Sequence, residues 1–476
     1  MRNVHTRRLG VHRLIMLVTM ATGASAAVAG PIADAYRSQA DRIIDAALTS
    51  DDAYTKLQHL CDDIGHRICG SEALDRAIEW ASAELRKDGM SNVHTEPVEV
   101  IRWVRGNESC EMVAPRRQPL VMLALGKSVG TPPDGITAPV VVVADEDELE
   151  KLGDGAKGKI VLFNNPMPPY DSEKGSGYGH TVRFRTNGAR LAAEKGAVAC
   201  LVRSVTAHSL RTPHTGTMNY KDAPVQIPAA AVTVEDAETI DRMTKRGIEV
   251  VLNIKMDAKN HGPAMSANVV GELRGSTHPE QIVVIGGHID SWDVGQGAHD
   301  DGGGCIMALA SVKLLKDLGL QPKRTIRVVL WTGEEIGLFG GKQYAKDHAD
   351  ELANHVAAME SDSGAFAPKG YGVDCKDESR MKAAADQLRD IMTLMEKIGA
   401  TDVSEGHGAP DVSPLQPEGV IVMGHEVEGS KYFDYHHTPA DTMDKVNPLE
   451  LKQNVAMMAT MAYILADMPQ RLGEKD

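Results

Sequence analysis

Apolar runs and helical repeats of apolar residues alternate along the C-terminal half of the chain. Strand-like runs and helix-like stretches follow one another there, at 281–287, 302–319, 324–331, 334–348, 355–362 and 447–468. Regular alternation of this kind is typical of an α/β domain. The pattern therefore predicts a mostly parallel central sheet flanked by helices.

The hydrophobic pattern changes in the middle of the chain. Between about 118 and 262, short β-like runs alternate with Gly and Pro turns and with two short helical stretches. Before this region, helical spacing covers 32–60 and 71–90, and an alternating strand pattern covers 93–103. We expect a β-rich domain inserted into a larger one. The expected division is 1–29, 30–117, 118–262 for the inserted domain, and 263–476.

The first 29 residues have the composition of an export signal. Four Arg residues precede the apolar run LIMLVTM, and the small-residue stretch ATGASAAVAG follows it. This order is that of a secretory signal peptide, and the apolar run is too short to span a bilayer. We expect residues 1–29 to be removed and the remaining chain to be secreted or periplasmic, without a membrane anchor.

Composition excludes several classes of protein and of binding site. The chain has 476 residues, 42% hydrophobic and 25% charged, which is typical of a folded globular protein. Its formal net charge of −15 argues against a nucleic-acid-binding protein, which normally carries a basic face. The six Cys have no CxxC spacing, which argues against a thiolate metal site. Cys61 and Cys69 lie close enough in sequence to pair after export, and the sequence leaves that pairing open.

The segment GGHIDSWDVGQGAHDDGGG, residues 286–304, concentrates Asp and His directly after a predicted strand. Acidic residues also follow the strand-like runs at 324–331 and 355–361. Ligands of open α/β sheets bind outside the carboxyl ends of the strands, where these side chains are expected to meet. The candidates are His288, Asp290, Glu334, Glu335 and Asp362, with Asp300 ahead of a helix and His437 in a later loop.

Carboxylates packed this closely require cations between them. Imidazole nitrogen and carboxylate oxygen together favour a borderline metal such as zinc. Two ions about 3.5–4 Å apart form a known hydrolytic arrangement. Five ligands with one shared would give each ion three protein groups and leave a position open for water. The sequence therefore predicts a catalytic site with two Zn²⁺ ions.

These motifs resemble those of the M28 metallopeptidases, the co-catalytic zinc exopeptidases. GGHIDSWDVGQGAHDDGGG, WTGEE, MESDSG and YHHTPADTMD occur in the order of that family, and the middle of the chain resembles a protease-associated domain. The resemblance implies five metal ligands, a general base and an orienting carboxylate. These are His288 and Asp362 on one ion, Glu335 and His437 on the other, Asp300 between them, Glu334 as the base and Asp290 against His288.

The resemblance also implies a substrate class. It implies the zinc-exopeptidase fold, a homodimer, and hydrolysis of short peptides by metal-activated water, with dipeptides that have free termini foremost. A peptidase that reads the substrate carboxylate needs a basic group, for which Arg183 and Arg185 are candidates. Asp411, in the loop 406–415, is a candidate for the specificity pocket.

Other functions stay open on the sequence alone. An M28 aminopeptidase would hold a free amine among the acidic residues near the metals. A glutaminyl cyclase has a similar core and one zinc. A binding protein without activity would have lost ligands, whereas no ligand position is missing from this chain. The spacing of the Asp residues does not match an EF-hand calcium loop.

Overall fold

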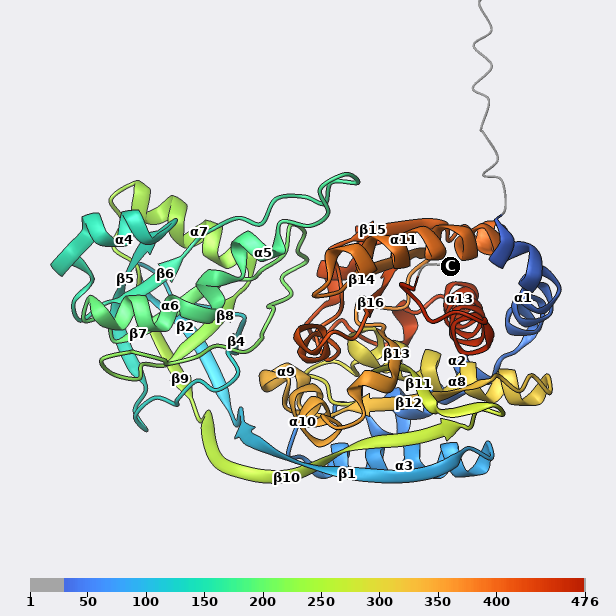
Figure 1. Ribbon diagram of the computed structural model, residues 1–476. Helices are drawn as coiled ribbons and strands as arrows, with labels where there is room; N and C mark the ends of the chain where they lie inside the picture. Colours follow the sequence, from blue (N-terminus) through green and yellow to red (C-terminus); the bar gives the residue numbers. More distant parts are fainter. Residues whose placement is uncertain (1–29, 475–476) are drawn as a thin grey trace, which may run out of the picture.

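Two eight-stranded sheets divide the protein into two domains (Figure 1). The computed structural model describes residues 30–474, so the expected signal sequence lies outside the described residues. In spatial order, the larger sheet contains β1 (Ser91–Val104), β10 (Lys259–Leu273), β12 (Arg324–Trp331), β11 (His278–His288), β13 (His355–Glu360), β16 (Val422–Val427), β14 (Pro368–Asp374) and β15 (Asp402–Glu405).

The centre of the larger sheet is parallel. β11 pairs in parallel with β12 on one side and with β13 on the other, and β13 pairs in parallel with β16. The flanking pairs β1–β10, β10–β12 and β14–β16 are antiparallel. The expected α/β class with a mostly parallel centre is therefore confirmed.

Apolar side chains cover both faces of this sheet. Side chains of successive strand residues point to opposite faces, so Val283 and Ile285 enter one core while Ile282 and Val284 enter another. The first core receives α1 (Pro31–Thr49), α2 (Asp52–Gln58), α3 (Glu72–Lys87), α8 (Gly303–Asp317), α11 (Glu378–Met392) and α13 (Pro448–Asp467), and the second receives α10 (Phe339–Asp347). Burial on both faces explains why the central strands read as continuous apolar runs.

The second sheet forms a domain inserted between β1 and β10, whose long strands run from the larger sheet toward it (Figure 1). Its spatial order is β3 (Gln118–Leu120), β2 (Glu108–Ala114), β9 (Val251–Met256), β5 (Ile136–Val143), β6 (Ile160–Phe163), β7 (Ala199–Arg203), β8 (Ala229–Val232) and β4 (Met122–Ala124). It carries the helices α4 (Glu146–Leu152), α5 (Tyr178–Thr181), α6 (Arg183–Glu194) and α7 (Val234–Lys245). We call residues 108–256 the insert. Because β2 pairs with β9, this sheet begins earlier in the chain than the expected boundary at 118.

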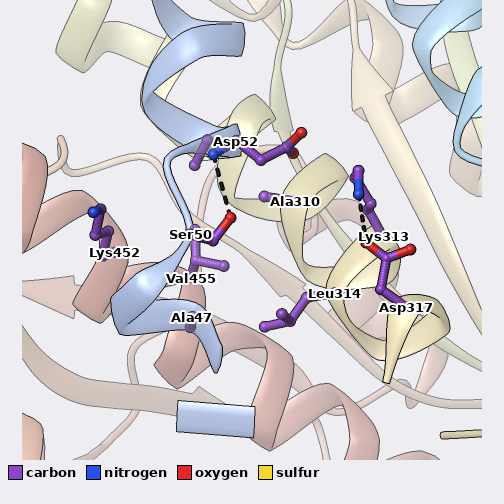
Figure 2. A pocket seen from close by; sticks show the side chains of 10 residues that line it. Ala47, Ser50, Asp52, Ala310, Lys313, Leu314, Asp317, Lys452 and Val455 are labelled. Carbon is purple, nitrogen blue, oxygen red and sulfur yellow. Dashed lines mark hydrogen bonds and ion pairs between the residues drawn. The ribbon is translucent and has the colours of Figure 1, made fainter. Parts of the chain in front are cut away.

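Two stretches with continuous helical spacing are interrupted in the structure. The stretch 32–60 breaks at Ser50, which is extended and whose Oγ accepts a hydrogen bond from the N–H of Asp52 at 3.2 Å (Figure 2). This end of α1 lies beside α8 and α13 around a hollow of about 30 Å³. The stretch 334–348 breaks at Leu338, whose φ of 58° is left-handed, into α9 (Glu334–Gly337) and α10. Periodicity alone does not reveal such breaks because the apolar spacing continues across them.

The six thiols are free and buried, so Cys61 and Cys69 do not form a disulfide. Burial raises the pKa of Cys61 to about 12, which keeps this thiol protonated and inert.

Within residues 30–474, no helix combines the length and the apolar character needed to cross a membrane.

Candidate functional site

The candidate site lies at the carboxyl ends of three neighbouring parallel strands. His288 is the last residue of β11, Glu334 and Glu335 follow β12 after a short turn, and Asp362 follows β13. The turn after β12 contains Gly333 in the left-handed region, with φ of 72°. The two domains together line an open cavity of about 1080 Å³ at these strand ends. The order of the strands therefore places the expected groups at one end of the sheet.

Asp300 lies between the two expected histidine ligands. Its Oδ1 is 3.1 Å from Nε2 of His288, and its Oδ2 is 3.3 Å from Nε2 of His437. Nε2 of His288 also lies 3.4 Å from Oδ1 of Asp362, and Nε2 of His437 lies 3.1 Å from Oε2 of Glu335. The five expected ligands thus form two groups that share the Asp300 carboxylate.

Main-chain carbonyls hold the other ring nitrogen of each histidine. Nδ1 of His288 donates to the carbonyl oxygen of Asp290 at 3.0 Å, and Nδ1 of His437 donates to that of Thr215 at 3.2 Å. A proton on Nδ1 leaves the lone pair on Nε2, the atom that faces Asp300. Both imidazoles are therefore oriented as metal ligands.

The site contains buried carboxylate oxygens that accept no hydrogen bond from the described residues. They are Oδ2 of Asp300 and Oε1 of Glu335. Burial, together with the neighbouring carboxylates, raises the pKa of Glu334 and of Glu335 well above their ordinary values. Buried oxygens without partners are costly unless a cation meets them. The donor atoms of imidazole and carboxylate that converge here fit zinc.

His436 lies beside the site but is less well placed than His437. Its ring stacks on that of His437 with 3.5 Å between centroids. Its Nε2 is 3.8 Å from Oδ2 of Asp300, whereas the corresponding distance from His437 is 3.3 Å. Only His437 of the pair also lies against Glu335, so the geometry favours His437 as the ligand.

The carboxylate of Asp290 serves a different partner from the one expected. Its Oδ1 lies 3.7 Å from Nδ1 of His288, and the hydrogen bond to that nitrogen is made by the Asp290 main chain. The carboxylate instead accepts the N–H groups of Glu334 at 3.1 Å and Glu335 at 3.4 Å. The expectation that the Asp290 side chain orients His288 is therefore wrong. The main-chain carbonyl of Asp290 lies nearer to Nδ1 and accepts its hydrogen bond instead.

Two aspartates that the sequence interpretation missed support the ligands. Asp441 accepts the N–H of His299 at 2.8 Å and that of Asp300 at 3.1 Å. Asp301 accepts the N–H of His288 at 3.0 Å and that of Gly304 at 2.9 Å, so both of its oxygens are occupied by main-chain donors. The signal for Asp441 was its place in YHHTPADTMD, and Asp301 had none beyond its adjacency to Asp300.

Only one of the three expected substrate-binding residues lines the cavity. Arg185 is buried, lines the cavity, and lies with Nη1 3.4 Å from Nδ1 of His437. Arg183 is exposed and lies 3.8 Å from Glu146, outside the cavity, so its expected role is wrong. Asp411 does not line the cavity either: it is buried, and its Oδ1 accepts the N–H of Gly341 at 3.2 Å. Its assignment to the specificity pocket is wrong because it joins the loop to α10.

Family models match both parts of the chain. The model described as peptidase family M28 matches residues 268–462, and the model described as PA domain matches residues 124–240. The first match contains the strands that carry the site, and the second lies within the insert. The division into two domains thus agrees with the families matched.

Relatives and solved structures extend the similarity to nearly the whole chain. Carboxypeptidase Q from Bos taurus is 42% identical over 420 residues, covering 88% of this chain and 86% of the relative. The crystal structure of an M28 peptidase precursor from Shewanella amazonensis SB2B is 39% identical, covers 92% of this chain and 98% of its own, and superposes with a TM-score of 0.87. A zinc aminopeptidase from Bacillus subtilis, 21% identical with a TM-score of 0.64 over 89% of this chain and 97% of its own, shares the fold.

Proposed function

Since the chain belongs to peptidase family M28 and is a metallo-exopeptidase, we propose that it uses two zinc ions to hydrolyse short peptides, foremost dipeptides with free termini. The observation that carries the proposal is the Asp300 carboxylate, whose two oxygens face the Nε2 atoms of His288 and His437. A shared carboxylate between two histidine groups suits a pair of ions.

Under this proposal five residues hold the two ions. His288 and Asp362 would hold one, Glu335 and His437 would hold the other, and Asp300 would contribute to both. Bound zinc would polarise the scissile carbonyl and lower the pKa of a water molecule from about 16 toward about 7. Oδ2 of Asp300 and Oε1 of Glu335 support this assignment, because each is buried and accepts no hydrogen bond, and such a carboxylate oxygen needs a positive charge beside it.

Glu334 is the proposed general base. It lines the cavity next to Glu335, and its main chain is held by Asp290. Its carboxylate has no hydrogen bond or ion pair with the described residues, so it is free to take a proton from water and to pass that proton to the leaving amine. Adjacent positions after β12 allow Glu335 to bind metal while Glu334 remains unligated.

Arg185 is the proposed recognition group for a substrate carboxylate. It projects from the insert into the cavity, 3.4 Å from the ring of His437. A guanidinium in a buried position binds carboxylates by charge-assisted hydrogen bonds. A free C-terminus one or two bonds from the scissile amide would lie within reach of such a group, which favours short substrates.

An aminopeptidase is the second candidate. The same cavity is lined by Asp402, Glu426 and Glu428, which could bind a free amine. Oε1 of Glu426 accepts a hydrogen bond from Ser404 at 2.5 Å, so its carboxylate is fixed in place. An enzyme that uses both ends of the cavity would require both substrate termini to be free.

The deciding experiment compares three forms of one dipeptide: free at both ends, N-acetylated, and C-amidated. Each is incubated with zinc-loaded protein and with protein treated with a chelator. A dipeptidase cleaves only the free form and loses activity on chelation. Cleavage of the amidated form would instead support the aminopeptidase, and cleavage of the acetylated form a carboxypeptidase. Hydrolysis that survives complete removal of metal would overturn the proposal.

Export is also proposed, on the basis of the order of charged, apolar and small residues within 1–29. Expression of the full chain with its own N-terminus, followed by N-terminal sequencing of the exported protein, tests it. A mature protein that begins near residue 27 or 30 is the expected result. Protein that stays in the cytoplasm with residue 1 intact would contradict it.

A further inference from the structure

The insert contacts an expected metal ligand through two reciprocal hydrogen bonds, one from its ring nitrogen and one to its main-chain carbonyl. Nδ1 of His437 donates to the carbonyl oxygen of Thr215 at 3.2 Å, and the N–H of Thr215 donates to the carbonyl oxygen of His437 at 3.0 Å. Thr215 is fully buried and His437 is 9% exposed. The orientation of this imidazole is thus set by the other domain.

Arg105 fixes the position of Thr215. Its Nη2 donates to Oγ1 of Thr215 at 3.3 Å, and its Nη1 donates to the carbonyl oxygen of Ala124 at 2.5 Å. Oγ1 of Thr215 in turn donates to that same carbonyl at 2.7 Å. Arg105 is itself 8% exposed, so it is an interior guanidinium rather than a surface charge.

The same guanidinium connects the insert to the loop between His288 and Asp300. Nε and Nη2 of Arg105 donate to the two carboxylate oxygens of Asp293, at 2.9 and 2.6 Å. Asp293 lies in the segment between His288 and Asp300. A bidentate pair of this kind is rigid and directional. Arg105 therefore holds Asp293 of the large domain and Thr215 of the insert in one arrangement.

The two expected histidine ligands differ in this respect. The Nδ1 partner of His288 is the carbonyl of Asp290, two residues along its own loop, whereas the Nδ1 partner of His437 comes from the insert. Partners of the second ring nitrogen orient a ligating histidine and raise its basicity, and their loss weakens metal binding. Displacement of Thr215 should consequently weaken one metal position and leave the other unchanged.

We propose that Arg105 is a positioning residue for the metal centre: through Thr215 it orients His437, so tight binding of the ion held by Glu335 and His437 requires the docked insert. This inference rests on the proposed two-zinc function. The insert, on this view, completes one of the two metal positions in addition to covering the cavity.

The test measures zinc binding directly. Metal-free protein is titrated with zinc in competition with a chromophoric chelator, for the wild type, Arg105→Met, Thr215→Val and the control Tyr220→Phe. Tyr220→Phe removes two partly buried hydrogen bonds within the insert, to Ile227 at 2.6 Å and from Val129 at 3.1 Å, without contacting His437. In Arg105→Met we expect one zinc dissociation constant to rise by about 10- to 100-fold while the other stays within about twofold.

Two further results are expected. Thr215→Val keeps the side-chain shape but removes both Oγ1 contacts, so it should weaken the same site by a smaller factor. Excess zinc should restore kcat in both variants, whereas a general loss of structure would not be rescued by metal. Tyr220→Phe should keep both zinc affinities of the wild type.

The inference and the proposed function fail in different ways. If the wild type binds fewer than two zinc ions tightly, the two-zinc function is wrong. If the wild type binds two and Thr215→Val or folded Arg105→Met binds both with unchanged affinity, the inference is wrong. Equal weakening of both sites in Thr215→Val would also overturn it, since the contacts reach His437 and not His288. Should Arg105→Met fail to fold, Thr215→Val decides the question.

Discussion

The carboxylate of Asp290 accepts the main-chain N–H of Glu334, with 3.1 Å between Oδ1 and the nitrogen. Asp290 follows β11 and Glu334 follows β12, so the bond joins the ends of two parallel strands. It fixes the first turn of the segment that carries both the proposed base and a proposed ligand. A buried aspartate is thus used to position the chemistry rather than to perform it.

Replacement of Asp290 by Asn should lower kcat while both zinc ions remain bound. The amide would present a donor where the carboxylate now accepts the N–H of Glu335, so the turn would shift. Loss of a supporting group of this kind typically costs about 10- to 100-fold in activity. Steady-state kinetics with zinc analysis measures it. The control is Asp377→Asn, because Asp377 accepts the N–H groups of Ser379 and Arg380 at the start of α11, away from the site. Equal activity of both variants would refute the role.

Glu334→Gln should abolish turnover without loss of metal. A general base contributes about 10²- to 10⁴-fold, and glutamine has no carboxylate to accept a proton. We expect kcat to fall by that factor with KM and zinc content unchanged. Glu335→Gln provides the contrast, because loss of a proposed ligand should reduce zinc content as well. Near-normal turnover by zinc-loaded Glu334→Gln would rule out Glu334 as the base.

Arg185→Met should reduce the discrimination in favour of a free C-terminus. A charge-assisted hydrogen bond contributes about 1.5–3 kcal/mol, which corresponds to about 10- to 150-fold in kcat/KM. The loss should appear with the free dipeptide and not in the residual rate with the C-amidated form. Arg183→Met is the matched control, since Arg183 lies two residues away and is exposed. A parallel loss for both substrates would show that Arg185 acts on the metal site instead.

His348 should make stability depend on pH in the mildly alkaline range. Burial alone would lower the pKa of His348, but hydrogen bonds to Glu351 and Glu96 outweigh it and raise the pKa from 6.5 to about 9. The charged imidazole is therefore bound more tightly in the folded state. Its contribution is complete below about pH 6.5 and is lost as the pH rises through about 9.

Glu351, a partner of His348, sets the acid limit of the pH range in which these interactions stabilise the folded protein. The hydrogen bond from His348, with Arg327, lowers the pKa of Glu351 from 4.5 to about 2, so that contribution is lost as pH falls from about 4.5 through about 2. The charged and titratable groups around this histidine are Glu96, Glu272, Arg327, Tyr344, Glu351 and His355. The melting temperatures of metal-free wild type and His348→Gln should differ most between about pH 4.5 and 6.5, where both contributions are complete. The difference should shrink toward about pH 10. A difference that stays constant from about pH 6 to 10 would contradict this account.

Gly126→Ala should destabilise the contact between the domains. A Cβ atom there would lie 2.2 to 3.3 Å from ring atoms of Trp292, whose ring is 5.5 Å from that of His437. Overpacking typically costs about 1–3 kcal/mol in the free energy of unfolding, and an indole cannot move aside as a flexible side chain can. Chemical denaturation measures the change. Gly179→Ala, where a Cβ atom meets nothing within 4 Å, should be tolerated, and an equal cost at both positions would argue against a steric cause.

Much of the fold and of the candidate site was predictable because both depend on local patterns. Apolar runs that alternate with helical spacing specify parallel strands, and parallel strands end at one edge. That geometry brings His288, Glu335 and Asp362 together without any knowledge of long-range contacts. The breaks at Ser50 and Leu338 escaped the pattern, since backbone conformation at a single residue leaves the apolar spacing intact.

What the sequence by itself determined was the types of donor atom and the strand ends that carry them. Tertiary structure alone decided which neighbours use those atoms. Arg183 and Arg185 look alike in sequence, but two residues along a helix rotate a side chain by more than half a turn, so only Arg185 enters the cavity. Likewise the partner of His437, the carbonyl of Thr215, comes from another domain more than two hundred residues away. A main-chain carbonyl is present at every residue, so no sequence pattern distinguishes the one that folding brings to the metal site.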